Sequence, residues 1–177
     1  MTHQPHHAGC GCLELLSRRR ALGLGLAAAA TVATPAFAID KGYEAMLLKC
    51  IDPRFTTNTW TYMSSRGWQN LYSQFNIAGG PIGVVAPAFA DWQKTYWDNL
   101  KITYDLHEVT RVVAITHRDC GAAVVAYGER IKTDRAFETK THVEALHAFR
   151  AEVGKRYPDL KVELGIMELS GAVEVVT

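Results

Sequence analysis

The run Arg111–Thr116 (RVVAIT) restricts the fold of this chain more than any other segment. It is β-branched and largely apolar, and apolar and polar residues do not alternate along it. A strand of that composition is buried on both faces, as in a parallel sheet covered by helices. The segment before it has a helical pattern that begins at Pro87. One face of that predicted helix carries Trp92, Tyr96, Leu100 and Thr103.

Other segments extend the same alternation of strands and helices. Strands are predicted for four more runs, at Glu44–Cys50, Asn70–Ile77, Lys161–Met167 and Ala172–Val176. Helices are predicted at 57–66, from about 120 to 128 and from about 133 to 157. Gly and Pro in succession predict a loop at 78–81. The sequence therefore predicts an α/β fold with a mainly parallel sheet of four to five strands flanked by helices.

The first 38 residues have the order of an export signal. A polar segment ends in Ser17-Arg18-Arg19-Arg20, and an uncharged run of small and apolar residues follows at 21–34. That run is shorter than the roughly 20 apolar residues of a transmembrane helix. Ala36-Phe37-Ala38 then offers small residues at the two positions that a signal peptidase recognises. The arginines favour a twin-arginine-type signal over one for the general export pathway, and an uncleaved N-terminal anchor is the alternative to a signal.

We therefore expect residues 1–38 to be a cleaved signal peptide and residues 39–177 to form one domain, periplasmic or secreted. The chain has 19 basic and 18 acidic residues, with a formal net charge of +1. This balance gives no electrostatic basis for binding nucleic acid or a membrane surface. Cleavage would remove Cys10 and Cys12, so that Cys50 and Cys120 are the two cysteines left.

Two segments carry residues suited to metal chemistry. Cys50–Arg54 follows the first predicted strand, and His117–Gly121 follows the strand Arg111–Thr116. Ligands of open parallel sheets bind beyond the carboxyl ends of the strands, so the two segments can meet there. Two thiolates and one imidazole form a Cys₂His set, which is typical of catalytic zinc. A disulfide between Cys50 and Cys120 is the alternative, because export leads to an oxidising compartment.

The two segments together resemble the metal-binding segments of the β-class carbonic anhydrases. The resemblance rests on Cys-x-Asp-x-Arg after the first strand and His-x-x-Cys-Gly after a later one, and it extends through Val112–Ala122 and Phe75–Gly80. It covers about residues 44–128 well and 129–177 loosely. It implies that Cys50, His117 and Cys120 hold one Zn²⁺ per chain. It also implies that Asp52 and Arg54 form a catalytic Asp–Arg pair beside the metal.

The resemblance further implies a zinc-dependent carbonate dehydratase that interconverts CO₂ and bicarbonate. Zinc lowers the pKa of bound water to about 7, a value known from carbonic anhydrases themselves, and the resulting hydroxide attacks CO₂. Asp52 would orient that hydroxide, and Arg54 would keep Asp52 ionised. In some family members this aspartate binds the metal and closes the site, which makes Asp52 a candidate fourth ligand. The family forms homodimers and larger homo-oligomers, so we expect the same here.

Some residues depart from the family pattern. Pro53 stands where the family usually has Ser, and Asn76-Ile77 stands where it has Arg-Asn. After the expected cleavage, almost nothing precedes Tyr43, whereas the family has an arm that wraps around the partner subunit. Two alternatives therefore stay open. One is a non-catalytic module of the same fold, stabilised by zinc or by a disulfide, and the other is a hydrolase of a CO₂-like molecule such as COS or CS₂.

Four polar residues near these segments receive weaker predictions. Asp119 precedes the helix predicted from about Cys120 and is expected to cap it. His107, His142 and His147 are expected to be surface residues, and each is a candidate for moving protons out of the site.

Overall fold

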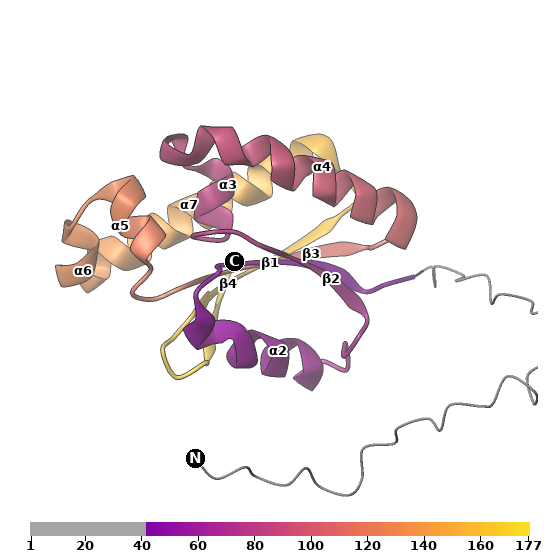
Figure 1. Cartoon of the computed structure of the whole chain (residues 1–177), viewed down its shortest axis with the longest axis horizontal. Helices are drawn as coiled ribbons and strands as arrows, with labels where there is room; N and C mark the ends of the chain where they lie inside the picture. Colours follow the sequence, from indigo (N-terminus) through magenta and orange to yellow (C-terminus); the bar gives the residue numbers. More distant parts are fainter. Residues whose placement is uncertain (1–41) are drawn as a thin grey trace, which may run out of the picture. The chain divides into compact units, whose positions relative to one another are not determined.

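A five-stranded sheet lies at the centre of the chain, with the strand order β2-β1-β3-β4-β5 (Figure 1). The computed structural model describes residues 42–177, and the predicted signal peptide lies outside them. The strands are β1 (Ala45–Lys49), β2 (Tyr72–Asn76), β3 (Arg111–His117), β4 (Lys161–Met167) and β5 (Val173–Val176). All neighbouring strands are parallel except β4 and β5. The prediction of an α/β fold with a mainly parallel sheet is confirmed.

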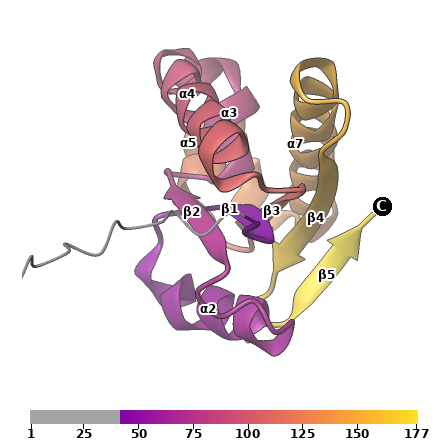
Figure 2. The same ribbon diagram turned by 90° about the vertical axis from the view of Figure 1, so that its right-hand side faces the viewer.

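Helices cover both faces of this sheet. On one face lie α3 (Pro81–Val85), α4 (Ala90–His107) and α7 (Arg135–Arg156), and on the other lies α2 (Thr56–Ser65) (Figure 2). The short helices α5 (Gly121–Tyr127) and α6 (Arg130–Thr133) lie at one end of the molecule (Figure 1). The 3₁₀ turns η1 (Pro53–Phe55) and η2 (Pro87–Phe89) lead into α2 and α4. None of the helices within residues 42–177 is long and apolar enough to cross a membrane.

Strand β1 divides the core between the two faces, and every one of its residues is buried. Met46 and Leu48 pack in a cluster with residues of α4 and α7. Ala45 and Leu47 pack in another cluster, with Phe55 before α2 and Met63 within it. Side chains alternate along a strand, so Lys49, two positions after Leu47, also points to the α2 face.

The loop predicted at 78–81 is wrong in its last residue, because helix α3 begins at Pro81. Gly80 makes this sharp entry possible, since its φ of 56° lies in the left-handed region that favours glycine. A Cβ on Gly80 would lie 3.0 Å from the carbonyl oxygen of Ile115 and from the carbonyl carbon of Lys49. The chain therefore turns into α3 while it is in close contact with β1 and β3.

The long helix predicted from about residue 133 to 157 is α7, and the short helix α6 precedes it, with Asp134 between the two. The Asp134 carboxylate accepts a hydrogen bond of 2.9 Å from the backbone N–H of Phe137 and so caps α7. Aspartate is among the best N-cap residues, which explains why α7 begins anew at Arg135 rather than continuing α6. Leu146, Phe149 and Val153 of α7 are buried in the core.

Candidate metal centre

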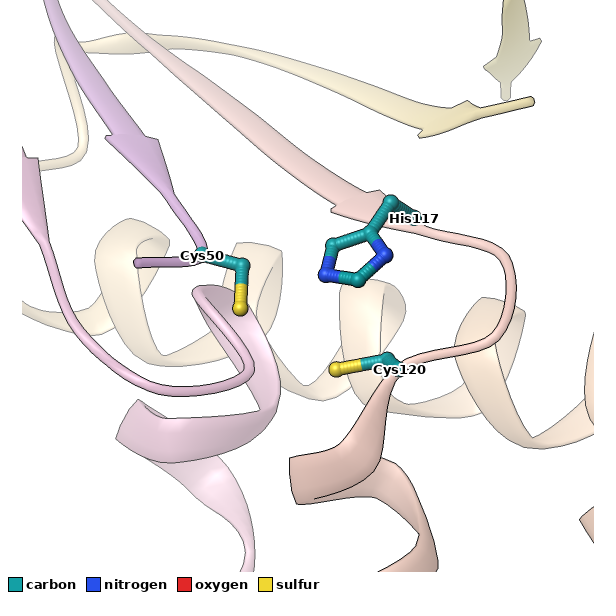
Figure 3. A group of neighbouring side chains, drawn as sticks. All are labelled: Cys50, His117 and Cys120. Atoms are coloured by element: carbon teal, nitrogen blue, oxygen red, sulfur yellow. The ribbon is translucent and has the colours of Figure 1, made fainter. Parts of the chain in front are cut away.

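The carboxyl ends of β1 and β3 bring three metal-ligating side chains together. Cys50 follows β1, His117 ends β3, and Cys120 precedes α5. Their ligand atoms all lie within 4.8 Å of one another, and all three residues are buried. Figure 3 shows the two sulfur atoms and the imidazole around one shared space. The structure thus places the predicted Cys₂His residues close enough to hold one ion.

The His117 ring is oriented for this role. Its Nδ1 lies 2.8 Å from the backbone carbonyl oxygen of Arg118, so Nδ1 carries the proton and donates. The other ring nitrogen, Nε2, is buried and has no hydrogen-bond partner among residues 42–177. Phe55 packs against the ring, with 4.2 Å between the ring centroids. A buried nitrogen with a free lone pair is costly, and a metal ion would satisfy it. The residues therefore fit a zinc ion.

Both cysteines are free thiols in this structure. The backbone N–H of Gly79 donates to the Cys50 sulfur at 3.2 Å. The hydrogen bond with the Cys120 side chain lowers the pKa of Cys50 to about 4, and the same contact together with burial raises the pKa of Cys120 above its ordinary value. A cation between the two sulfurs would also favour deprotonation of Cys120, since zinc binds thiolates.

Asp52 faces the same space. Its Oδ2 lies 4.0 Å from Nε2 of His117. Arg54 holds the Asp52 carboxylate through its Nε at 3.1 Å, its Nη2 at 2.7 Å and its backbone N–H at 2.9 Å. The hydrogen bonds from the Arg54 side chain are the main reason why the pKa of Asp52 lies below its ordinary value. Asp52 is therefore an ionised carboxylate beside the candidate metal ligands.

Arg54 also connects the two loops, and this contact corrects the prediction for Asp119. Nη1 of Arg54 donates to the Asp119 carboxylate at 2.8 Å, and Nη2 donates to the Asp119 carbonyl oxygen at 3.0 Å. Cys120, not Asp119, is the N-cap residue of α5, and no side chain caps that helix. The prediction that Asp119 caps α5 is wrong, because its left-handed backbone, with a φ of 57°, orients the carboxylate toward Arg54.

Sequence reasoning missed Arg118, which follows His117. Its side chain is only 4% exposed, although arginine is seldom buried. Its guanidinium donates to four side chains that lie 20 to 56 positions away in the sequence, namely Glu138 at 3.4 Å, Thr139 at 2.8 Å, Glu168 at 3.2 Å and Glu174 at 3.0 Å. Glu138 also accepts the backbone N–H of Asp119 at 2.9 Å. This cluster holds the backbone between His117 and Cys120 in place.

The three other histidines within residues 42–177 do not gather at the centre. His142 is fully buried, with Nδ1 2.7 Å from the Thr116 hydroxyl, so its predicted place on the surface is wrong. Burial lowers the pKa of His142 to about 3. His107 lies 2.6 Å from the Ser73 hydroxyl, and the exposed His147 lies 2.8 Å from the carbonyl oxygen of Thr177. None of these hydrogen bonds involves a candidate metal ligand.

Solved carbonic anhydrases have a similar fold. A carbonic anhydrase from Streptococcus mutans superposes with a TM-score of 0.54 at 18% sequence identity, over 81% of this chain and 87% of that one. A carbonic anhydrase from Glaciozyma antarctica gives 0.52 at 16% identity, over 77% and 83%. A β-carbonic anhydrase from Aspergillus fumigatus gives 0.52 at 15% identity, over 80% and 78%. The fold is therefore like that of the β-carbonic anhydrases.

Sequence comparison gives no function. An uncharacterized protein of Rickettsia bellii is 28% identical over 131 residues, which are 74% of this chain and 80% of that protein. An uncharacterized protein of Rickettsia conorii is also 28% identical over 131 residues, 70% of its length. No protein-family model matches the chain. What the fold and the site define is a β-carbonic-anhydrase-like domain with a Cys-His-Cys centre that resembles a zinc site.

Proposed function

We propose that this protein is a zinc-dependent carbonic anhydrase, with one zinc ion per chain. One observation carries the proposal. On a fold like that of the β-carbonic anhydrases, the ligand atoms of Cys50, His117 and Cys120 lie within 4.8 Å of one another, beside the ionised Asp52. Three protein ligands with room left for water are typical of catalytic rather than structural zinc.

The reaction joins CO₂ and water into bicarbonate and releases one proton. Cys50, His117 and Cys120 would hold the zinc, which supplies the Lewis acidity that makes water nucleophilic near neutral pH. Asp52 Oδ2 would accept a hydrogen bond from the attacking water and so direct a lone pair of the water oxygen at the carbon of CO₂. Arg54 would keep Asp52 ionised and in position, since it donates four hydrogen bonds at 3.1 Å or less to that carboxylate.

Asp52 would have a different role in a closed state of the site. If the hydrogen bonds from Arg54 broke, the carboxylate could move onto the metal as a fourth ligand and exclude water from it. Asp52 lies near enough for this because its Oδ2 is 4.0 Å from Nε2 of His117. Arg54 would then act as the residue that keeps the site open.

We also propose that the protein is a periplasmic or secreted homo-oligomer. The Arg-Arg segment and Ala36-Phe37-Ala38 support export by the twin-arginine route. That route transports folded proteins, so zinc loaded before export would protect Cys50 and Cys120 from oxidation. Cell fractionation and analytical ultracentrifugation test these two points. Protein recovered from the cytoplasm with residues 1–38 attached would contradict export, and a monomer would contradict assembly.

The test of the activity compares the protein with two substituted forms. We expect CO₂ hydration, measured by stopped flow on zinc-loaded protein, to fall about 100-fold in Asp52→Asn. Asp98→Asn is the matched control, because Asp98 is an exposed aspartate that pairs with Lys94 on α4. Equal rates in all three forms would refute the proposed role of Asp52. Zinc binding without hydration would favour the non-catalytic module, and turnover of COS or CS₂ alone would favour the hydrolase.

A further inference from the structure

Lys49 is a buried lysine that the proposed reaction does not use. It is the last residue of β1, is 4% exposed and directly precedes the metal ligand Cys50. Within residues 42–177 its ammonium group has no hydrogen-bond or ion-pair partner. The aliphatic part of the Lys49 side chain is buried, and the residue lines a cavity, so an anion in that cavity would pair with its ammonium group.

Lys49 and Cys50 lie on opposite faces of the sheet. Cys50 packs with residues of α3 and α5, including Ile82 and Ala123. Lys49 points to the α2 face, as do Ala45 and Leu47 of the same strand. Figure 2 shows α2 on the opposite side of β1 from α3 and α5. A ligand at Lys49 would therefore occupy a site of its own.

A cavity of about 350 Å³ opens at Lys49, between α2, the carboxyl end of β1 and the length of β2. The side-chain amides in its lining are those of Asn70, Gln74 and Asn76, and its aromatic residues are Trp60 and Tyr72. Its volume lies within the range of small-molecule sites, roughly 300–1,000 Å³. The cavity therefore combines one cation, several hydrogen-bond donors and two aromatic walls.

This lining selects for a particular kind of ligand. A single positive charge suits a monoanion, and the amides of Asn70, Gln74 and Asn76 can donate to carboxylate oxygens. Thr56, in the first turn of α2, also lines the cavity, so the positive end of that helix adds to the attraction. Trp60 is 49% exposed, which leaves apolar surface to cover an organic group.

We propose that this cavity binds a small organic monocarboxylate. The carboxylate would pair with the Lys49 ammonium and accept hydrogen bonds from the side-chain amides, and the apolar part would pack on Trp60 and Tyr72. The site is separate from the metal centre, although it lies only one residue along the chain from a metal ligand.

Isothermal titration calorimetry of the zinc-loaded full chain tests this site, with benzoate and acetate as probes. We expect benzoate to bind more tightly than acetate. In Lys49→Met the affinity for benzoate should fall at least about tenfold, because a charge-assisted hydrogen bond is lost. Trp60→Ala should weaken benzoate more than acetate. Lys140→Met is the control, since Lys140 is an exposed lysine of α7, on the other face of the sheet.

Several outcomes would overturn the proposal. They are the absence of benzoate binding to the unaltered protein, equal binding by Lys49→Met, and binding of bicarbonate or inorganic phosphate in place of benzoate. If Lys49→Met does not fold by circular dichroism, the half-exposed Trp60 still allows the test through Trp60→Ala. Zinc content measured on every sample separates a failure of this site from a failure of the metal centre.

Discussion

The two loops that form the metal centre are held in different ways. The loop after β1 is held by a local contact, in which Arg54 binds Asp52 two positions earlier, and the Arg54 side chain is 47% exposed. The loop after β3 is held by Arg118, which is 4% exposed and binds side chains 20 to 56 positions away. The comparison suggests a division of roles. In the first loop the Asp52 carboxylate depends on one local ion pair, whereas in the second loop the candidate ligands His117 and Cys120 flank a buried arginine with distant partners.

The largest effect is expected from a substitution that removes one of the proposed zinc ligands, because the zinc joins the two loops. Cys120→Ser should lower zinc affinity by more than about 100-fold, because changes in residues that only support ligands already cost about 10- to 100-fold. CO₂ hydration should disappear with the zinc. Competition with a chromophoric chelator gives the affinity. Full hydration activity in metal-free Cys120→Ser would contradict the whole account.

Arg118→Met should lower both the stability of the protein and its zinc affinity, because the loop after β3 depends on Arg118. The substitution leaves Glu138 buried without its cation, so the free energy of unfolding should fall by about 3 kcal/mol. Zinc affinity should fall about tenfold, because the loop between His117 and Cys120 is less well fixed. Urea denaturation of metal-free protein and chelator competition give the two values. Arg130→Met, at an exposed arginine paired with Asp134, is the control, and equal behaviour of the two would refute the role of Arg118.

Arg54→Met should differ from Arg118→Met. The urea midpoint should change little, whereas the hydration activity should fall clearly. Arg54 lowers the pKa of Asp52, so its removal lets that pKa rise toward the ordinary value. The Asp52 carboxylate then takes up a proton at a higher pH. Hydration should fall about tenfold near neutral pH. The acid limb of its pH profile should move to higher pH. An unchanged limb would show that Arg54 does not control the charge on Asp52.

Asp119→Asn should have the smallest effect. Asp119 is 60% exposed, and exposed ion pairs contribute little. Arg54 keeps its contacts with Asp52 and with the Asp119 carbonyl oxygen, so hydration should change by less than about fivefold. A loss as large as that of Arg54→Met would mean that the bridge between the loops, rather than the Asp52–Arg54 pair, controls the reaction.

The same contrast between local and long-range contacts explains what could be predicted from the sequence. The strands and the two segments that carry the candidate metal ligands could be predicted, because apolar runs and short motifs are local signals. The partners of Arg118 could not, since they come from α7, the end of β4 and β5. The burial of His142 could not be predicted either, because its contact with Thr116 joins a helix to a strand 26 positions away in the sequence. The left-handed backbone of Asp119 gave no sequence signal, since that conformation favours glycine.

The central claim is that Cys50, His117 and Cys120 bind one zinc ion together. X-ray absorption at the zinc edge of the purified protein tests it most directly. The account predicts about one zinc per chain, with two sulfur ligands at about 2.3 Å and nitrogen or oxygen ligands at about 2.0–2.1 Å. Protein that contains no zinc and has a disulfide between Cys50 and Cys120, or zinc bound without sulfur, would contradict it.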